Sequence, residues 1–94
     1  MKLETAKLLK AAANHAGIDL EINEDYSGRG MYGRTTTAIE VESSNDIFAI
    51  LAVFVDESFD IDHQSNLVEA DRYEAMEDIA SIKSDSLGRQ VIFY

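Results

Sequence analysis

The sequence predicts an α+β domain in which a small antiparallel or mixed sheet of about three strands packs with three helices. Three observations lead to this prediction. Apolar residues recur at helical spacing in separate stretches, apolar and polar residues alternate in short segments between them, and 46% of the 94 residues are hydrophobic. A chain of this length suits one domain, so residues 1–94 are expected to fold as a single α+β unit with the order αββααβ.

The first expected element is an amphipathic helix that ends at Gly17. Its apolar positions recur every three or four residues: Leu3, Leu8, Leu9, Ala12, Ala13 and Ala16. Gly17 can adopt the left-handed conformation that ends a helix. After it, Ile18, Leu20 and Ile22 alternate with polar residues and predict a half-buried strand that stops near Glu24.

A second strand and a second helix are expected next. The β-branched run at residues 35–41 predicts a strand that pairs with the first, with Ala38 on one face and Ile39 and Val41 on the other. Residues 43–46 offer oxygen acceptors for a helix start, and nine consecutive apolar residues follow them. This pattern favours a helix over residues 45–57, packed on two sides, over a buried strand.

The C-terminal part of the chain predicts a third helix and a last strand. Residues 58–66 suit a connection. Apolar residues then recur at helical spacing: Leu67, Ala70, Tyr73, Met76, Ile79, Ala80 and Ile82. Asp85, Ser86 and Gly88 are typical of a turn, and residues 91–94 are expected to form the last strand.

Charge constrains the function. Eighteen acidic and eight basic side chains give a formal net charge of -10, which disfavours direct binding to nucleic acid or to an anionic membrane. Residues 35–71 contain no Lys or Arg but carry nine carboxylates: Glu40, Glu42, Asp46, Asp56, Glu57, Asp60, Asp62, Glu69 and Asp71. One interpretation is a solvated face that maintains solubility, and the other is a surface that binds a basic protein.

Several classes of chemistry are not expected. The chain has no cysteine, which excludes thiolate catalysis, disulfides and cysteine-ligated metals. No catalytic triad or nucleophile elbow appears, so the protein is not expected to be an enzyme. A partial calcium-loop pattern that starts at Asp60 lacks the required glycine and the closing glutamate, so neither a metal nor a cofactor is expected.

The expected location is cytoplasmic. The longest apolar run, residues 47–55, is shorter than the roughly 20 residues that a membrane-spanning helix needs. The first thirty residues carry no signal-peptide pattern.

The glycine-rich segment at residues 26–35 is the most unusual stretch of the sequence. Three glycines fit the G-x-G-x-x-G pattern: Gly28, Gly30 and Gly33. Dinucleotide binding through that pattern needs a helix after the glycines, and a β-branched run follows here instead. The simplest interpretation is a turn with Tyr26 and Tyr32 folded over the sheet edge. Side chains typical of interfaces also make the segment a candidate contact loop: Arg29, Met31, Tyr32 and Arg34.

Residues 26–35 (YSGRGMYGRT) and 85–94 (DSLGRQVIFY) together resemble a family of small uncharacterised bacteriophage and prophage proteins. The remainder of the chain is similar only in the placing of a helix before the first segment and a hydrophobic helix after it. The resemblance implies no activity and no catalytic residue. It implies a phage context, in which small acidic proteins often bind and inhibit a host factor, including nuclease and CRISPR defence machinery.

The leading hypothesis is therefore a non-enzymatic acidic phage protein that binds and inhibits a basic, nucleic-acid-handling host protein. It would act as a partial DNA mimic of the anti-defence or anti-CRISPR type. The candidate partner-binding residues are Glu40, Glu42, Asp56, Glu57, Asp60, Asp62, Arg29, Met31, Tyr32 and Arg34. Two alternatives stay open: a small-ligand or nucleotide-binding domain that uses residues 28–33, and a structural phage protein that forms a homodimer through an exposed sheet edge.

Overall fold

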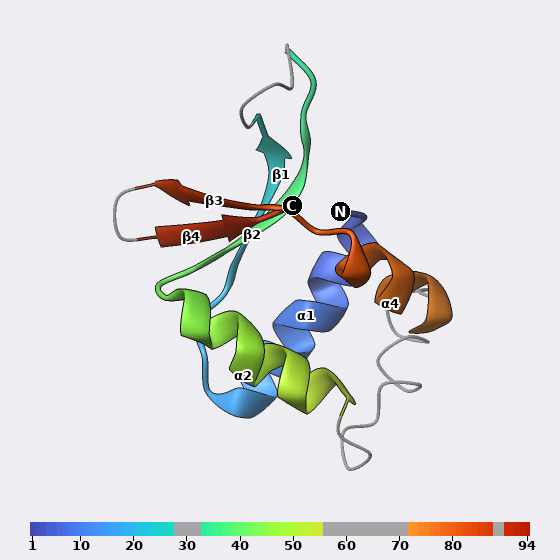
Figure 1. The fold of residues 1–94 in the computed structure, drawn as a ribbon, viewed down its shortest axis with the longest axis vertical. Coiled ribbons are helices and arrows are strands. Elements are labelled where there is room, and N and C mark those ends of the chain that lie inside the picture. The colour runs from blue at the N-terminus through green and yellow to red at the C-terminus, as the bar shows by residue number, and fades with distance from the viewer. Residues whose placement is uncertain (28–32, 56–71, 88–89) are drawn as a thin grey trace.

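The computed structural model of the protein describes residues 1–27, 33–55, 72–87 and 90–94. Its described elements are α1 (Leu3–Ala16), β1 (Glu21–Tyr26), β2 (Thr36–Val41), α2 (Ser44–Val55), α4 (Arg72–Ala80), β3 (Ser84–Leu87) and β4 (Gln90–Phe93). The described strands form one antiparallel sheet in the order β1-β2-β4-β3, and Figure 1 shows the helices gathered on the same side of it. The predicted α+β class is confirmed, with a four-stranded sheet in place of about three strands.

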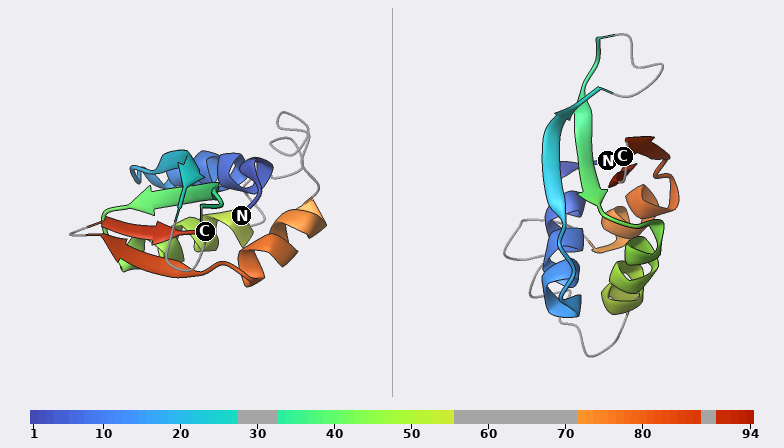
Figure 2. Two further views of the ribbon diagram at one scale, coloured as in Figure 1. Left: turned by 90° about the horizontal axis from the view of Figure 1, so that it is seen from above. Right: turned by 90° about the vertical axis from the view of Figure 1, so that its left-hand side faces the viewer.

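The hydrophobic core lies between the helices and one face of the sheet. Side chains from α1, β2, α2 and β4 meet in it: Leu8, Leu9, Ile39, Val41, Ile47, Ile50, Phe54 and Phe93. Because side chains alternate along a strand, Ala38, Glu40 and Ile92 lie on the opposite face, as the sequence predicted for Ala38. In Figure 2 the β1–β2 pair extends past the helices at one end of the molecule.

Helix α1 matches the prediction closely. Its buried side follows the expected stripe, although Ala16 at the end of the helix is exposed. Gly17 ends the helix in the left-handed conformation with φ 72°, and the N–H of Ile18 donates to the Ala13 carbonyl at 2.9 Å.

Strand β1 begins later and runs further than the alternation of Ile18, Leu20 and Ile22 predicted. It starts at Glu21 and continues to Tyr26, because backbone pairing with β2 does not require apolar side chains. Between Asn23 and Tyr26 the register shifts by a β-bulge. The bulge brings Tyr26 opposite Thr36, on the same face as Ala38, whereas strict alternation from Asn23 would place it on the helix side.

Helix α2 begins where its capping residues predicted. The Ser43 hydroxyl accepts a hydrogen bond from the Asn45 N–H at 3.2 Å, and the Asp46 carboxylate accepts one from the Ser43 N–H at 3.3 Å. The expected end near residue 57 lies outside the described residues. None of the helices in the described part of the chain is long and apolar enough to cross a membrane.

The prediction that α2 packs on two sides is wrong for the described structure. Ile47, Ile50 and Phe54 are buried, whereas Phe48 is 69% exposed and Ala49 is exposed as well. The helix packs against α1 and β2 with one side only, so its apolar character exceeds what this fold buries.

The stripe predicted for the third helix is confirmed only in part. Ile79 and Ile82 pack against the core as predicted, whereas Met76 is 43% exposed, Ala80 is exposed, and Ala75 is buried instead. Contact with α1 determines which side of α4 is buried, because the apolar pattern of the segment is too weak to determine it. Leu67 and Ala70 lie outside the described residues.

The turn predicted at Asp85 and Ser86 is wrong. Both residues belong to strand β3, which pairs antiparallel with β4, and Lys83 and Tyr94 exchange backbone hydrogen bonds of 2.9 Å. A polar edge strand of four residues has no apolar alternation by which the sequence could reveal it. The segment becomes a strand because its backbone pairs with β4. Gly88 lies outside the described residues.

Candidate functional site

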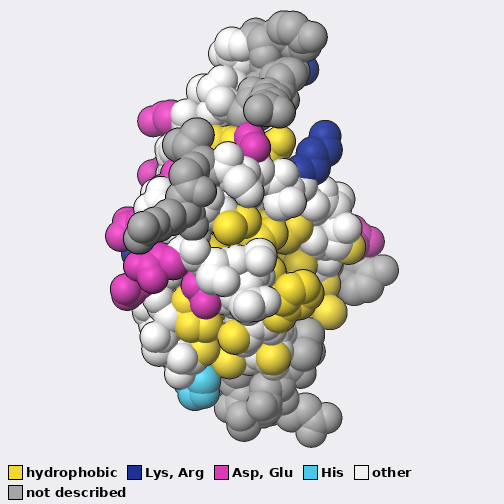
Figure 3. Space-filling model, turned by 60° about the vertical axis from the view of Figure 1, so that its left-hand side comes forward, with side chains coloured by type: hydrophobic (Ala, Val, Ile, Leu, Met, Phe, Trp, Pro, Cys, Tyr) yellow, Lys and Arg dark blue, Asp and Glu magenta, His cyan; other side chains and the backbone are white. Residues whose placement is uncertain are grey.

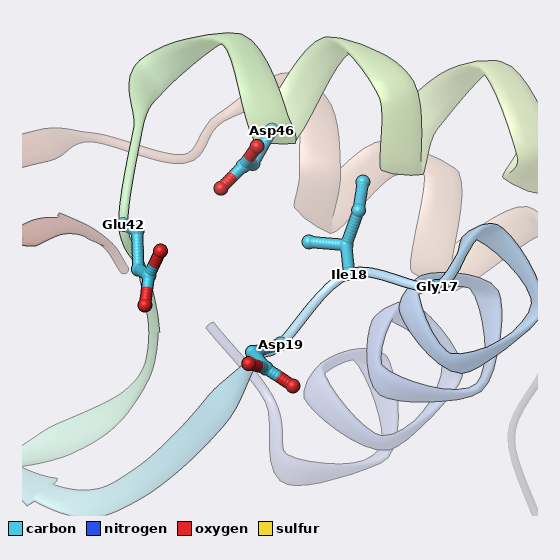
Figure 4. A pocket seen from close by; sticks show the side chains of 5 residues that line it. All are labelled: Gly17, Ile18, Asp19, Glu42 and Asp46. Atoms are coloured by element: carbon cyan, nitrogen blue, oxygen red, sulfur yellow. The ribbon is translucent and has the colours of Figure 1, made fainter.

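Carboxylates from several elements lie at the end of the sheet where β1 begins and β2 ends. We define the acidic cluster as Asp19, Glu21, Glu40, Glu42 and Asp46. Glu21 and Glu40 face each other directly in the β1–β2 register. The three other members line a pocket of ≈ 200 Å³, and Figure 4 shows their side chains around one opening with Ile18 beside them.

The local structure explains why these side chains meet. In an antiparallel pair the start of one strand lies beside the end of the other, which places Glu21 opposite Glu40. The left-handed Gly17 turns the chain from α1 into β1 and leaves Asp19 at the entrance of the strand. Asp46 is fixed from the other side because it caps α2.

The acidic cluster carries negative charge that no described cation neutralises. Asp19, Glu21 and Glu42 are exposed, and Glu40 and Asp46 are half-buried. The ion pair found among the described residues, Lys2 with Glu74 at 3.6 Å, joins the residue before α1 to α4 and involves no member of the cluster. Like charges directly opposite each other in a sheet are destabilising, so the Glu21–Glu40 pair costs stability in the free protein.

This chemistry suits binding of cationic groups. Among the described residues, no group of three or more His, Cys, Asp or Glu side chains is arranged to hold a metal ion. One Asp46 oxygen is already occupied by the helix cap. Exposed carboxylates around a shallow opening can accept hydrogen bonds from lysine or arginine side chains of another molecule.

The structure brings together only part of the predicted partner-binding set. Glu40 and Glu42 belong to the acidic cluster, whereas Arg34 lies before β2, at the other end of that strand. The remaining predicted residues lie outside the described ranges: Asp56, Glu57, Asp60, Asp62, Arg29, Met31 and Tyr32. Asp19 and Glu21 were missed, although the predicted hairpin contained the signal, because it already placed the start of β1 beside the end of β2.

A second group of polar side chains lies on the sheet face opposite the helices. The Tyr26 hydroxyl donates a hydrogen bond of 2.8 Å to the Asp85 carboxylate, and the Tyr26 and Tyr94 rings lie 5.0 Å apart. Burial first, then the hydrogen bond to Asp85 and the negative charges of Asp85, Tyr94 and Glu40, raise the pKa of Tyr26 to about 12. On the same face Ile92 is only 1% exposed, which indicates a small second core. The hydrogen bond and the ring contact join β1 to β3 and to the C-terminal residue across this face.

The sheet edges argue against self-association through strand pairing. β1 carries Glu21, Glu24 and Asp25 along its length and is interrupted by the bulge. β3, at the other edge, has four residues and carries Asp85. Charges, bulges and short strands at an edge discourage pairing with another chain. The homodimer alternative therefore gains no support from the described edges.

Comparisons of the chain with protein-family models, with curated proteins and with solved structures give no match. The resemblance to phage proteins stays a prediction, and the function is argued from the surface itself.

Proposed function

We propose that this protein is a non-enzymatic binding protein that captures a basic, nucleic-acid-handling host protein through its acidic surface. The observation that carries the proposal is the acidic cluster, whose five carboxylates lie at one end of the sheet without an ion pair to any described Lys or Arg. A cationic groove that normally holds a phosphate backbone would be attracted to this surface.

The attraction has a defined range. The Debye length is about 8 Å at physiological salt, so exposed carboxylates act mainly on cations that come into contact and on the rate of encounter. A formal net charge of -10 adds a long-range term that repels DNA and RNA themselves. The protein would therefore compete with nucleic acid for one basic partner.

The phage resemblance narrows the class of partner. Inhibition of a host nuclease or of CRISPR machinery would require occupation of its nucleic-acid groove. The carboxylates then act as a partial substitute for the phosphates of DNA, with affinity that falls as salt rises.

A matched pair of double variants tests the proposal. Glu21→Gln with Glu42→Gln removes two charges from the acidic cluster, and Glu4→Gln with Glu77→Gln removes two exposed charges from α1 and α4. Each protein is immobilised and exposed to bacterial lysate at about 0.05 M and about 0.5 M salt, and bound proteins are quantified by mass spectrometry.

We expect the wild type and the α1/α4 control to retain the same basic protein at low salt. The cluster variant should retain at least several-fold less of it. Excess duplex DNA should displace it. Equal retention by the two variants would show that the acidic cluster does not bind the partner.

A further inference from the structure

Helix α2 carries more apolar surface than its own fold uses. Nine consecutive apolar residues, 47–55, run through it, and a surface helix normally turns a polar side to solvent. The core takes Ile47, Ile50 and Phe54, and half-buried Leu51 and Val53 pack against it. Phe48, Ala49 and Ala52 are left exposed, and we call these three residues the outer face of α2.

The outer face of α2 has the anatomy of a contact surface. Phe48 is 69% exposed and is flanked by two alanines, so a large aromatic side chain projects from a helix whose backbone a partner can approach closely. Figure 3 shows hydrophobic side chains over much of the lower part of this side of the molecule, with acidic side chains along one border. Helix α2 starts at the acidic cluster, since Asp46 lies in its first turn.

We propose that the outer face of α2 docks an amphipathic helix with basic flanks, supplied by the partner. The proposal rests on the proposed function, because it names how the basic partner is held after charge has attracted it. Apolar side chains of that helix would cover Phe48, and its lysines or arginines would reach carboxylates such as Glu42 at the start of α2.

Charge argues against a second copy of this chain as the occupant. No Lys or Arg occurs in residues 35–71, the stretch of sequence that contains α2, while nine carboxylates do. Two copies docked through α2 would bring together two proteins that each have a formal net charge of -10. A cationic partner would not be repelled in this way.

A single introduced tryptophan can report on this surface. The protein contains no tryptophan, so Phe48→Trp gives one emission signal from the outer face of α2. Met76→Trp, at the exposed large hydrophobic residue of α4, is the matched control. The probe is a synthetic helix of leucine and lysine of about 18 residues, five turns, with its leucines on one side. A peptide of the same composition in scrambled order has equal charge but no apolar side.

We expect the amphipathic peptide to shift the emission of the Phe48→Trp protein to shorter wavelength and to protect it from acrylamide, and to leave the Met76→Trp protein unchanged. Phe48→Ser should weaken binding by at least about tenfold, measured by calorimetry, because it deletes an aromatic anchor without disturbing the core. The scrambled peptide should bind more weakly and should not distinguish Phe48→Ser from the wild type.

The outcomes separate this inference from the proposed function. Weaker binding by Glu21→Gln with Glu42→Gln, but no emission change at position 48, would retain electrostatic capture and overturn docking on α2. An emission shift with undiminished binding by the charge variant would retain docking and contradict the electrostatic proposal. A wild-type dimer that Phe48→Ser converts to monomer in sedimentation would identify a second copy as the occupant and overturn the proposal.

Discussion

Tyr26 illustrates how one backbone irregularity decides the surroundings of a side chain. The bulge after Asn23 turns Tyr26 to the sheet face opposite the helices, where its hydroxyl reaches Asp85 and its ring reaches Tyr94. Asp85 is 59 residues away in the sequence. The contact therefore ties the first strand of the sheet to the last hairpin, at the base of the glycine-rich segment.

The raised pKa of Tyr26 predicts a loss of stability in alkali. An unfolded tyrosine ionises near pH 10, whereas Tyr26 in the folded protein ionises at about 12. The folded state holds this proton more tightly, so its contribution is complete below pH 10 and is lost as the pH rises through 12. The Tyr26→Phe protein has no phenol to ionise and lacks this contribution at every pH. The difference in unfolding free energy between the wild type and Tyr26→Phe should therefore narrow from pH 9 to pH 12.

Urea unfolding followed by circular dichroism over this pH range measures the gap. Tyr94→Phe is the control, because it removes a smaller cause of the raised pKa but keeps the Tyr26–Asp85 hydrogen bond, and it should lose stability over the same pH range as the wild type. If the unfolding free energies of the wild type and Tyr26→Phe change in parallel with pH, the raised pKa of Tyr26 does not contribute to stability.

Among the elements, the helices differ in how much of their own sequence explains them. Helix α1 has an apolar stripe, a polar side and a left-handed glycine at its end, and all three agree with its position in the fold. Helix α2 has a clear start but no polar side, which is why its packing was predicted wrongly. Helix α4 has only a weak pattern of apolar residues, and contact with α1 determines which of its sides is buried.

The cap of α2 can be tested by deleting one hydroxyl. Ser43→Ala removes the acceptor of the Asn45 N–H and should lower the unfolding free energy by about 1 kcal/mol. Ser44→Ala, at the next position and exposed, is the matched control and should change it by less than about 0.5 kcal/mol. Thermal or urea unfolding of both variants provides the measurement, and equal losses would show that the Ser43 hydroxyl does not cap the helix.

The whole molecule combines a small core with a surplus of negative charge. One core holds the helices on the sheet, and the acidic cluster sits where β1, β2 and α2 meet at one end of that core. Self-repulsion among these carboxylates destabilises the free protein, and a cationic partner would relieve it. Stability and binding are therefore expected to respond in opposite directions to the same charge change.

Glu21→Lys tests this opposition. It converts the Glu21–Glu40 like-charge pair into an opposite pair and changes the formal net charge from -10 to -8, since one negative charge is removed and one positive charge is added. We expect the unfolding free energy to rise by about 0.5 kcal/mol at low salt while retention of the basic partner falls. Glu77→Lys, on the exposed side of α4, makes the same net change away from the cluster and should leave partner retention unchanged. If Glu21→Lys is stabilised but retains the basic partner as well as the wild type does, the acidic cluster does not bind that partner.

The sequence by itself determined the α+β class, helix α1 with its glycine end, strand β2, the start of α2 and the large negative charge. These features depend on neighbours within one turn or one strand, where capping, periodicity and β-branching act. Only the tertiary structure decided strand β3, the buried side of α4, the bulge that turns Tyr26, and the position of Asp46 of α2 beside Asp19 and Glu42. Each of these depends on contacts between segments far apart in the chain, and local pattern carries no information about which partner a polar strand or a weakly amphipathic helix will find.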